Sequence, residues 1–209
     1  MKKAVVSGAV AGTVASVFFA LILAGALFLY LGQPDGPVSP AAVSIAGADI
    51  GGPFTLTDHT GTRVTSAEVI DGPTLIYFGY TFCPDICPVD VALMASAVDL
   101  LAEQGLEVTP VFITVDPARD TPEALAYYAE AMHPRMIALT GTEAEVKTAT
   151  DAYKVYYQRV DLAESAADYL MNHTTFTYFV TPDGLKGLFR NGFPPEEMAG
   201  EIARILSRD

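Results

Sequence analysis

Two cysteines and one histidine are the residues of this chain whose types and spacing could do chemistry. Cys83 and Cys87 are its only cysteines, and they lie four positions apart in the segment TFCPDICP, residues 81–88. Positions i and i+4 share one face of a helix, so both sulfurs can face the same side of a turn that enters a helix. A helix N-terminus stabilises anions, and we therefore expect at least one of the two thiols to ionise more readily than a free cysteine.

Three interpretations of this cysteine pair compete. A structural disulfide suits an exported protein, but a bridge that closes so short a loop restrains little of the unfolded chain. A dithiol redox couple usually has two intervening residues rather than the three found here. A metal site needs at least one ligand beyond the two thiolates, and soft sulfur donors select copper(I) or zinc. The spacing alone leaves all three open.

The chain has three histidines from which a further metal ligand could come. His59 falls in the turn of an expected hairpin and His133 precedes a proline at an expected helix end, so both are predicted to be exposed polar residues. His173 stands directly before a buried strand, where its side chain could lie at the same end of a sheet as the cysteines. Position alone leaves His173 as either a ligand or a capping or core histidine.

The elements around these residues predict an α/β fold. The apolar run Thr74–Tyr80 is typical of a buried central strand, and residues 89–104 carry apolar side chains at helical spacing. The cysteines lie between them, at the carboxyl end of the strand, where α/β sheets bind ligands. A hairpin within 54–65, strands at 108–115, 136–139, 174–180 and 185–189, and helices at 121–132, 142–153 and 195–207 complete the expected order. This order predicts a thioredoxin-like fold, with a central mixed sheet flanked by helices. The polar segment before His173 is expected to be a mobile surface stretch.

Composition excludes several classes of protein. The chain has 209 residues, of which 51% are hydrophobic, so it can bury a core and is not a disordered segment. Two cysteines are too few for a disulfide scaffold. With 12 basic against 25 acidic residues, the chain lacks the basic surface that a nucleic-acid partner requires.

The apolar excess is concentrated at the N-terminus. No charged residue occurs from Ala4 to Gln33, and Lys2 and Lys3 precede this stretch. This pattern predicts a single N-terminal transmembrane helix, with the N-terminus in the cytoplasm and the rest of the chain outside it. A cleaved signal peptide is the alternative, because Ala24-Gly25-Ala26 offers a cleavage site, but the apolar run continues beyond it.

Three regions follow from this pattern. Residues 1–32 are predicted to be the membrane anchor, 33–47 a linker rich in proline, glycine and alanine, and 48–209 the thioredoxin-like domain. Without the two N-terminal lysines, the remainder has 10 basic and 25 acidic residues and a net charge of −15. We expect a single-pass protein of the cell inner membrane whose acidic soluble domain is periplasmic.

The segment that contains the two cysteines resembles the CPxxCP motif of the Sco/SenC family of copper-binding proteins. Five further segments agree with that family: Gly51–Leu56, Phe78–Thr81, the run from Val115 to Pro122, Tyr169–His173 and Pro182–Gly184. The resemblance extends over nearly the whole predicted soluble domain. The chain departs from the family at Asn172, where an acidic residue often precedes the histidine.

The resemblance implies that Cys83, Cys87 and His173 bind one copper ion, as Cu(I) or Cu(II). It implies a metallochaperone that assists assembly of the CuA site in subunit II of cytochrome c oxidase. Other periplasmic copper donors or thiol reductants are further expected partners. The resemblance also implies an alternative, a membrane-anchored thiol-disulfide reductase that acts on the subunit II cysteines. A copper or redox sensor is a third hypothesis.

Overall fold

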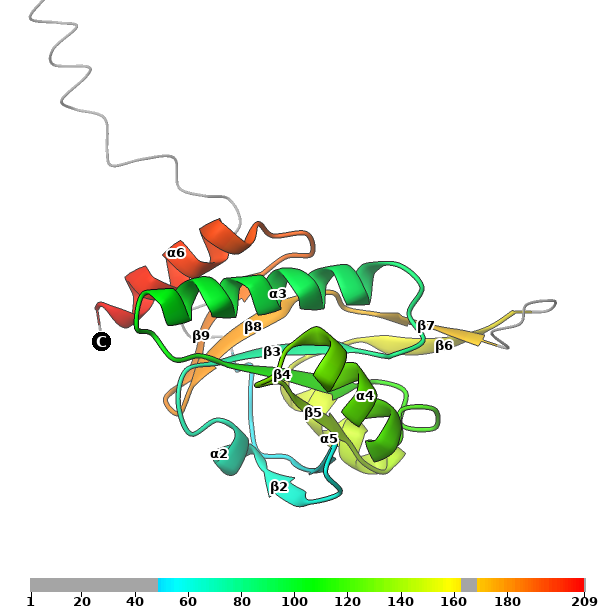
Figure 1. Ribbon diagram of the computed structural model, residues 1–209. Coiled ribbons are helices and arrows are strands. Elements are labelled where there is room, and N and C mark those ends of the chain that lie inside the picture. Colours follow the sequence, from blue (N-terminus) through cyan, green and yellow to red (C-terminus); the bar gives the residue numbers. More distant parts are fainter. Residues whose placement is uncertain (1–48, 163–168, 209) are drawn as a thin grey trace, which may run out of the picture. The chain divides into compact units, whose positions relative to one another are not determined.

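The computed structural model describes residues 49–162 and 169–208 (Figure 1). The predicted membrane anchor, 1–32, and the predicted linker, 33–47, lie outside the described residues, so both stay predictions. Within the described part, no helix has the length and apolar character needed to cross a bilayer.

A seven-stranded mixed sheet forms the centre of the described domain, in the order β2-β1-β5-β4-β3-β8-β9. Its strands are β1 (Thr55–Asp58), β2 (Arg63–Thr65), β3 (Thr74–Gly79), β4 (Thr109–Thr114), β5 (Ile137–Thr140), β8 (Thr177–Thr181) and β9 (Gly184–Phe189). Strands β3, β4 and β5 are parallel, whereas β8 pairs antiparallel with β3, and β1 with β5. All six residues of β3 are buried, as expected for a continuous apolar strand at the middle of a sheet.

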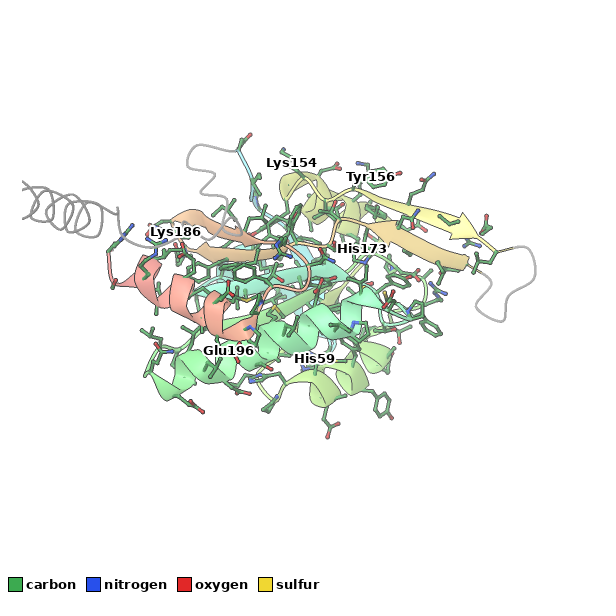
Figure 2. All side chains as sticks on the ribbon, turned by 90° about the horizontal axis from the view of Figure 1, so that it is seen from above. His59, Lys154, Tyr156, His173, Lys186 and Glu196 are labelled. Atoms are coloured by element: carbon green, nitrogen blue, oxygen red, sulfur yellow. The ribbon has the colours of Figure 1, made fainter. Side chains whose placement is uncertain are left out.

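Helices cover both faces of this sheet. They are α2 (Ser66–Val69), α3 (Ile86–Glu103), α4 (Pro122–Met132), α5 (Glu143–Ala152) and α6 (Pro195–Leu206). Helices α3 and α6 pack side by side on one face, and α4 contacts α3 (Figure 1). Helix α5 contacts β1 and lies on the other side of the sheet from α3, close to Lys154 in Figure 2. The α/β architecture expected from the sequence is therefore confirmed.

Helices α4 and α5 begin within one residue of the positions that the sequence predicts. Thr121 caps α4 by accepting a hydrogen bond from the backbone N–H of Ala124, and Pro122 occupies the first turn, where it loses no hydrogen bond. Thr142 and Glu145 form a capping box at the start of α5. Helix α3 begins three residues earlier than expected, at Ile86, so it includes the second cysteine.

The residues on either side of the polar segment before His173 form two strands that the sequence did not predict. Strands β6 (Tyr157–Asp161) and β7 (Tyr169–His173) pair as a separate two-stranded antiparallel sheet. Residues 163–168, between them, lie outside the described part of the chain, so the expected mobile stretch there stays a prediction. His173 ends β7 and pairs with Tyr157 at the base of this hairpin. Both figures show the two strands extending past the end of the main sheet.

The expectation that His59 and His133 are exposed is also wrong. His133 is buried at the end of α4, where its Nε2 lies 3.2 Å from an Asp99 carboxylate oxygen and its Nδ1 accepts from the backbone N–H of Arg135. His59 is half-buried, and its Nδ1 accepts from the backbone N–H of Ala138. Each ring thus accepts a backbone hydrogen bond, which makes both histidines part of the fold.

Candidate metal centre

The candidate site lies where the central strand passes into helix α3. Strand β3 ends at Gly79, a short loop carries Cys83, and Cys87 occupies the second position of α3. Cys87 is fully buried, whereas Cys83 is half-buried. The backbone N–H of Cys87 points at the Cys83 sulfur at 3.5 Å, so the start of the helix donates toward that sulfur.

Close packing between β3 and α3 positions the Cys87 sulfur. A Cβ atom added to Gly79 would lie 2.9 Å from the Tyr77 ring, 3.0 Å from the Phe112 ring and 3.3 Å from the Cys87 sulfur. The absence of a side chain at residue 79 therefore lets the helix approach the strand. Asp85 occupies the N-cap position of α3, but its side chain makes no capping hydrogen bond there.

His173 reaches the cysteines from the base of the β6–β7 hairpin. Its Nε2 lies 3.0 Å from the Cys87 sulfur, although the two residues are 86 positions apart in the sequence. On the other side of the ring, Nδ1 lies 2.9 Å from the carbonyl oxygen of Thr174. A carbonyl oxygen only accepts, so Nδ1 is the donor to Thr174, and Nε2 is the ring nitrogen that faces the Cys87 sulfur.

The three predicted site residues therefore meet. The sulfurs of Cys83 and Cys87 and a ring nitrogen of His173 all lie within 4.8 Å of one another, and no other group of three potential metal ligands occurs among residues 49–162 and 169–208. Figure 2 shows His173 beside the central strand, away from His59. A hydrogen bond from the second ring nitrogen to a backbone carbonyl is the arrangement that usually orients a metal-binding histidine.

The two thiols differ in acidity. The Cys87 thiol, which can donate to the Cys83 sulfur, lowers the pKa of Cys83 to about 3, and His173 and backbone N–H groups act in the same direction against the effect of burial. The neighbouring Cys83 sulfur and burial together raise the pKa of Cys87. The pair therefore holds one thiolate, on the more exposed sulfur, and one thiol proton, on the buried sulfur.

Aromatic rings form the walls of the site, and sequence analysis did not single them out. The rings of Tyr77 and Tyr80 meet the His173 ring edge to face, with centroids 6.2 and 5.8 Å away. The Tyr77 hydroxyl donates to the buried carboxylate of Asp90 at 3.2 Å, and burial raises the pKa of that carboxyl. The sequence could have indicated Tyr77, because a tyrosine in a predicted buried strand needs a hydrogen-bond partner for its hydroxyl.

The acidic and basic residues after β4 organise the loops around the site. Asp120 is fully buried and accepts from the backbone and hydroxyl of Thr81 and from the hydroxyl of Thr114, which joins the cysteine loop to the end of β4.

Asn172 is exposed on β7, and strand alternation directs its side chain away from the face that His173 occupies. An acidic residue at position 172 would therefore not point at the three donor atoms.

Comparisons with known proteins agree with this geometry. The sequence pattern of the SCO1/SenC family matches residues 42–207. The chain is 46% identical over 162 residues to the protein SenC of Rhodobacter capsulatus, which covers 77% of this chain and 72% of that protein. Copper-bound ScoI of Arabidopsis thaliana superposes with a TM-score of 0.73 at 35% identity, covering 77% of this chain and 99% of that structure. Copper-bound ScoI of Bradyrhizobium japonicum gives a TM-score of 0.67 at 37% identity, over 75% and 99%. The predicted thioredoxin-like fold is confirmed.

Proposed function

The chain belongs to the SCO1/SenC family, and from that membership we propose that it is a copper metallochaperone. One copper ion is bound by the sulfurs of Cys83 and Cys87 and by Nε2 of His173. The observation that carries this proposal is the convergence of these three donor atoms to within 4.8 Å, from two separate parts of the sequence. Copper-bound structures of two relatives support the choice of metal.

The donor set suits this metal. Two thiolates and an imidazole are soft to intermediate donors that favour copper(I) in a three-coordinate arrangement, and a weak fourth ligand would let the same set hold copper(II). A structural zinc site would need four protein ligands, and the described residues supply three at this place. One of the two thiols is already ionised in the metal-free site, so binding releases a proton mainly from Cys87.

A site with three protein ligands is suited to transferring its metal to a partner protein. Cys83 is the more exposed of the two sulfurs, so a thiolate of a partner protein can approach the ion beside it before a ligand leaves. We assign the partner as subunit II of cytochrome c oxidase, at its CuA site, because oxidase assembly is the role that the family resemblance implies. The chain acts there as a single-pass protein of the inner membrane, anchored by residues 1–32, with its soluble domain in the periplasm.

Copper titration of the full chain under reducing conditions tests the ligand set. We expect one copper(I) per chain, and at least about tenfold weaker binding for Cys83→Ala, Cys87→Ala and His173→Ala, because each removes one of three ligands. His59→Gln is the matched control, since His59 lies in the β1–β2 turn and contacts the backbone of β5 instead. Unchanged affinity in His173→Ala would refute the proposed coordination.

A thiol-disulfide reductase is the second candidate, favoured by the lowered pKa of Cys83. The Cys83 thiolate would attack a disulfide of the partner and release one partner thiolate. The Cys87 thiol would then lose its proton and displace the second partner sulfur, leaving a Cys83–Cys87 disulfide and a reduced partner. This activity requires both cysteines but tolerates His173→Ala, whereas copper transfer to purified subunit II requires all three residues. A copper sensor would bind the ion and transfer none.

A further inference from the structure

The loop after β4 contains an arginine that the proposed copper chemistry does not use. Arg119 lies in the segment DPARD, residues 116–120, and its side chain is largely buried, with 16% of its surface exposed. Its Nε donates to the carboxylate of Asp116 at 2.5 Å. A largely buried guanidinium is costly unless its contacts are specific, so the other contacts of Arg119 are informative.

Arg119 contacts both of the segments that supply donor atoms. On the cysteine side, its guanidinium carbon lies 4.7 Å from the centre of the Phe82 ring, and Phe82 immediately precedes Cys83. On the histidine side, Nη1 donates to the carbonyl oxygen of Tyr169 at 3.1 Å, and the guanidinium stacks 3.7 Å from the centre of the Tyr169 ring. One side chain thus bridges the cysteine loop and strand β7.

Tyr169 is the point at which the hairpin is attached. Tyr169 and His173 are four residues apart on β7, so their side chains lie on the same face of the strand. The Tyr169 hydroxyl donates to the second Asp116 oxygen at 2.8 Å. Strands β6 and β7 form their own sheet, without a ladder to the seven-stranded sheet. Apart from its chain connections at the base, the hairpin is therefore held by side-chain contacts such as these, which add to the positioning of His173.

We propose that Arg119 is a positioning residue, which holds the cysteine loop and the β6–β7 hairpin in the relative placement that brings Cys83, Cys87 and His173 together. The inference rests on the proposed copper-binding function. Arginine suits this role because its planar guanidinium stacks on aromatic rings and donates in several directions at once, whereas lysine provides a compact charge without either property. A site whose ligands come from separate elements loses affinity when their supporting contacts are removed, even if every ligand remains.

The test compares Arg119→Lys and Arg119→Gln with a matched control, Arg159→Gln, in the full chain. Arg159 stacks 3.8 Å from the centre of the same Tyr169 ring, but its ion-pair partner, Asp161, belongs to the hairpin itself. Removing Arg159 takes away a positive charge near Asp116 and Tyr169 but leaves in place the contacts of Arg119 with the Phe82 ring and with the Tyr169 carbonyl. Copper(I) affinity is measured by competition with a chelator, and the copper(II) site by electron paramagnetic resonance. We expect both Arg119 variants to bind copper about 10- to 100-fold more weakly, with altered copper(II) hyperfine splitting, and Arg159→Gln to stay within about twofold of the original chain.

Nuclear magnetic resonance of the metal-free, reduced chain separates this inference from the proposed function. The His173 ring signals should lose the signature of the hydrogen bond to Thr174 and of contact with Cys87 in the Arg119 variants, while Arg159→Gln retains both. This result supports the positioning role even if the original chain fails to bind copper. Normal His173 signals together with unchanged copper affinity and spectra in Arg119→Gln would overturn it. If Arg119→Gln fails to fold, Tyr169→Phe, which removes only the hydroxyl that binds Asp116, is judged by the same readouts.

Discussion

At the scale of single residues, the two cysteines are chemically unequal, although the sequence presents them as a pair. The backbone N–H of Cys87 faces the Cys83 sulfur, and Cys83 is also the sulfur closer to solvent. The Cys87 thiol lowers the pKa of Cys83 to about 3, while the same contact and burial raise the pKa of Cys87. The nucleophile and the first sulfur available to a metal or a partner is therefore Cys83.

This inequality predicts an unusual pH dependence of alkylation in the reduced, metal-free chain. A thiol with an ordinary pKa near 8.5 reacts about tenfold faster for each pH unit between pH 5 and 8, because only the thiolate attacks. Cys83 is already ionised throughout that range, so its rate of reaction with iodoacetamide should be almost constant from pH 5 to 8. Peptide mass mapping should locate the label on Cys83 rather than on the buried Cys87.

The control for this prediction is Cys87→Ala. The Cys87 side chain is the largest cause of the lowered pKa of Cys83, and alanine removes that hydrogen-bond donor. The pKa of Cys83 should rise in this variant, and a dependence of the alkylation rate on pH should return. A rate in the original chain that climbs tenfold per pH unit would show that Cys83 is an ordinary thiol.

At the scale of elements, the site depends on how closely helix α3 packs against strand β3. Gly79→Ala should destabilise the fold by about 1–3 kcal/mol, because the new methyl group would overlap the rings of Tyr77 and Phe112 and press on the Cys87 sulfur. Urea unfolding of the metal-free chain measures this effect. The displacement of Cys87 should also weaken copper binding.

Gly200→Ala is the comparison for this substitution. Gly200 lies inside α6, and a Cβ atom added there meets nothing within 4 Å. Alanine at position 200 should stabilise the chain by about 0.5–1 kcal/mol, since it reduces the backbone entropy of the unfolded state. If Gly79→Ala and Gly200→Ala changed the free energy of unfolding by the same amount, the close contact between α3 and β3 would not be what requires glycine at position 79.

Some of these elements could be predicted from the sequence, and others could not. Strand β3 and the helices α4 and α5 carry strong local signals, namely a continuous apolar run and clear N-caps. The β6–β7 hairpin carries none, because it stands outside the main sheet and both of its faces are partly exposed, so its residues show no regular alternation. The burial of His133 could not be read from the local sequence either, because its partner Asp99 comes from another helix, α3.

The three proposed ligands could be singled out from the sequence, but the geometry in which they meet could not. Residue types and the family resemblance single out Cys83, Cys87 and His173. The orientation of His173 depends on the Thr174 carbonyl and on the attachment of the hairpin through Tyr169, which are contacts formed only by the folded chain. Asp116, Arg119 and Asp120 organise loops around the site, and the sequence does not identify what each of them joins.

At the scale of the whole molecule, the proposed copper site can form only when the domain is folded. Its donors come from the loop after β3, from the start of α3 and from the end of β7, and His173 is 86 residues away from Cys87 in the chain. An unfolded chain retains two nearby cysteines but separates them from the histidine. A ligand that prefers the folded state must stabilise it, in proportion to the logarithm of the ligand concentration.

Copper should therefore stabilise the reduced chain and leave the oxidised chain unaffected. At a free copper(I) concentration about 100 times the dissociation constant, the free energy of unfolding should rise by up to about 2.7 kcal/mol, less whatever the unfolded cysteines bind. Oxidation of Cys83 and Cys87 to a disulfide removes two of the three donors, so the gain should vanish. Urea unfolding with and without copper, for the reduced and the oxidised chain, measures both effects. His173→Ala in the reduced form should show a smaller gain, because its two remaining cysteines bind copper in the folded and unfolded states alike. An equal gain for the oxidised chain would mean that copper binds elsewhere.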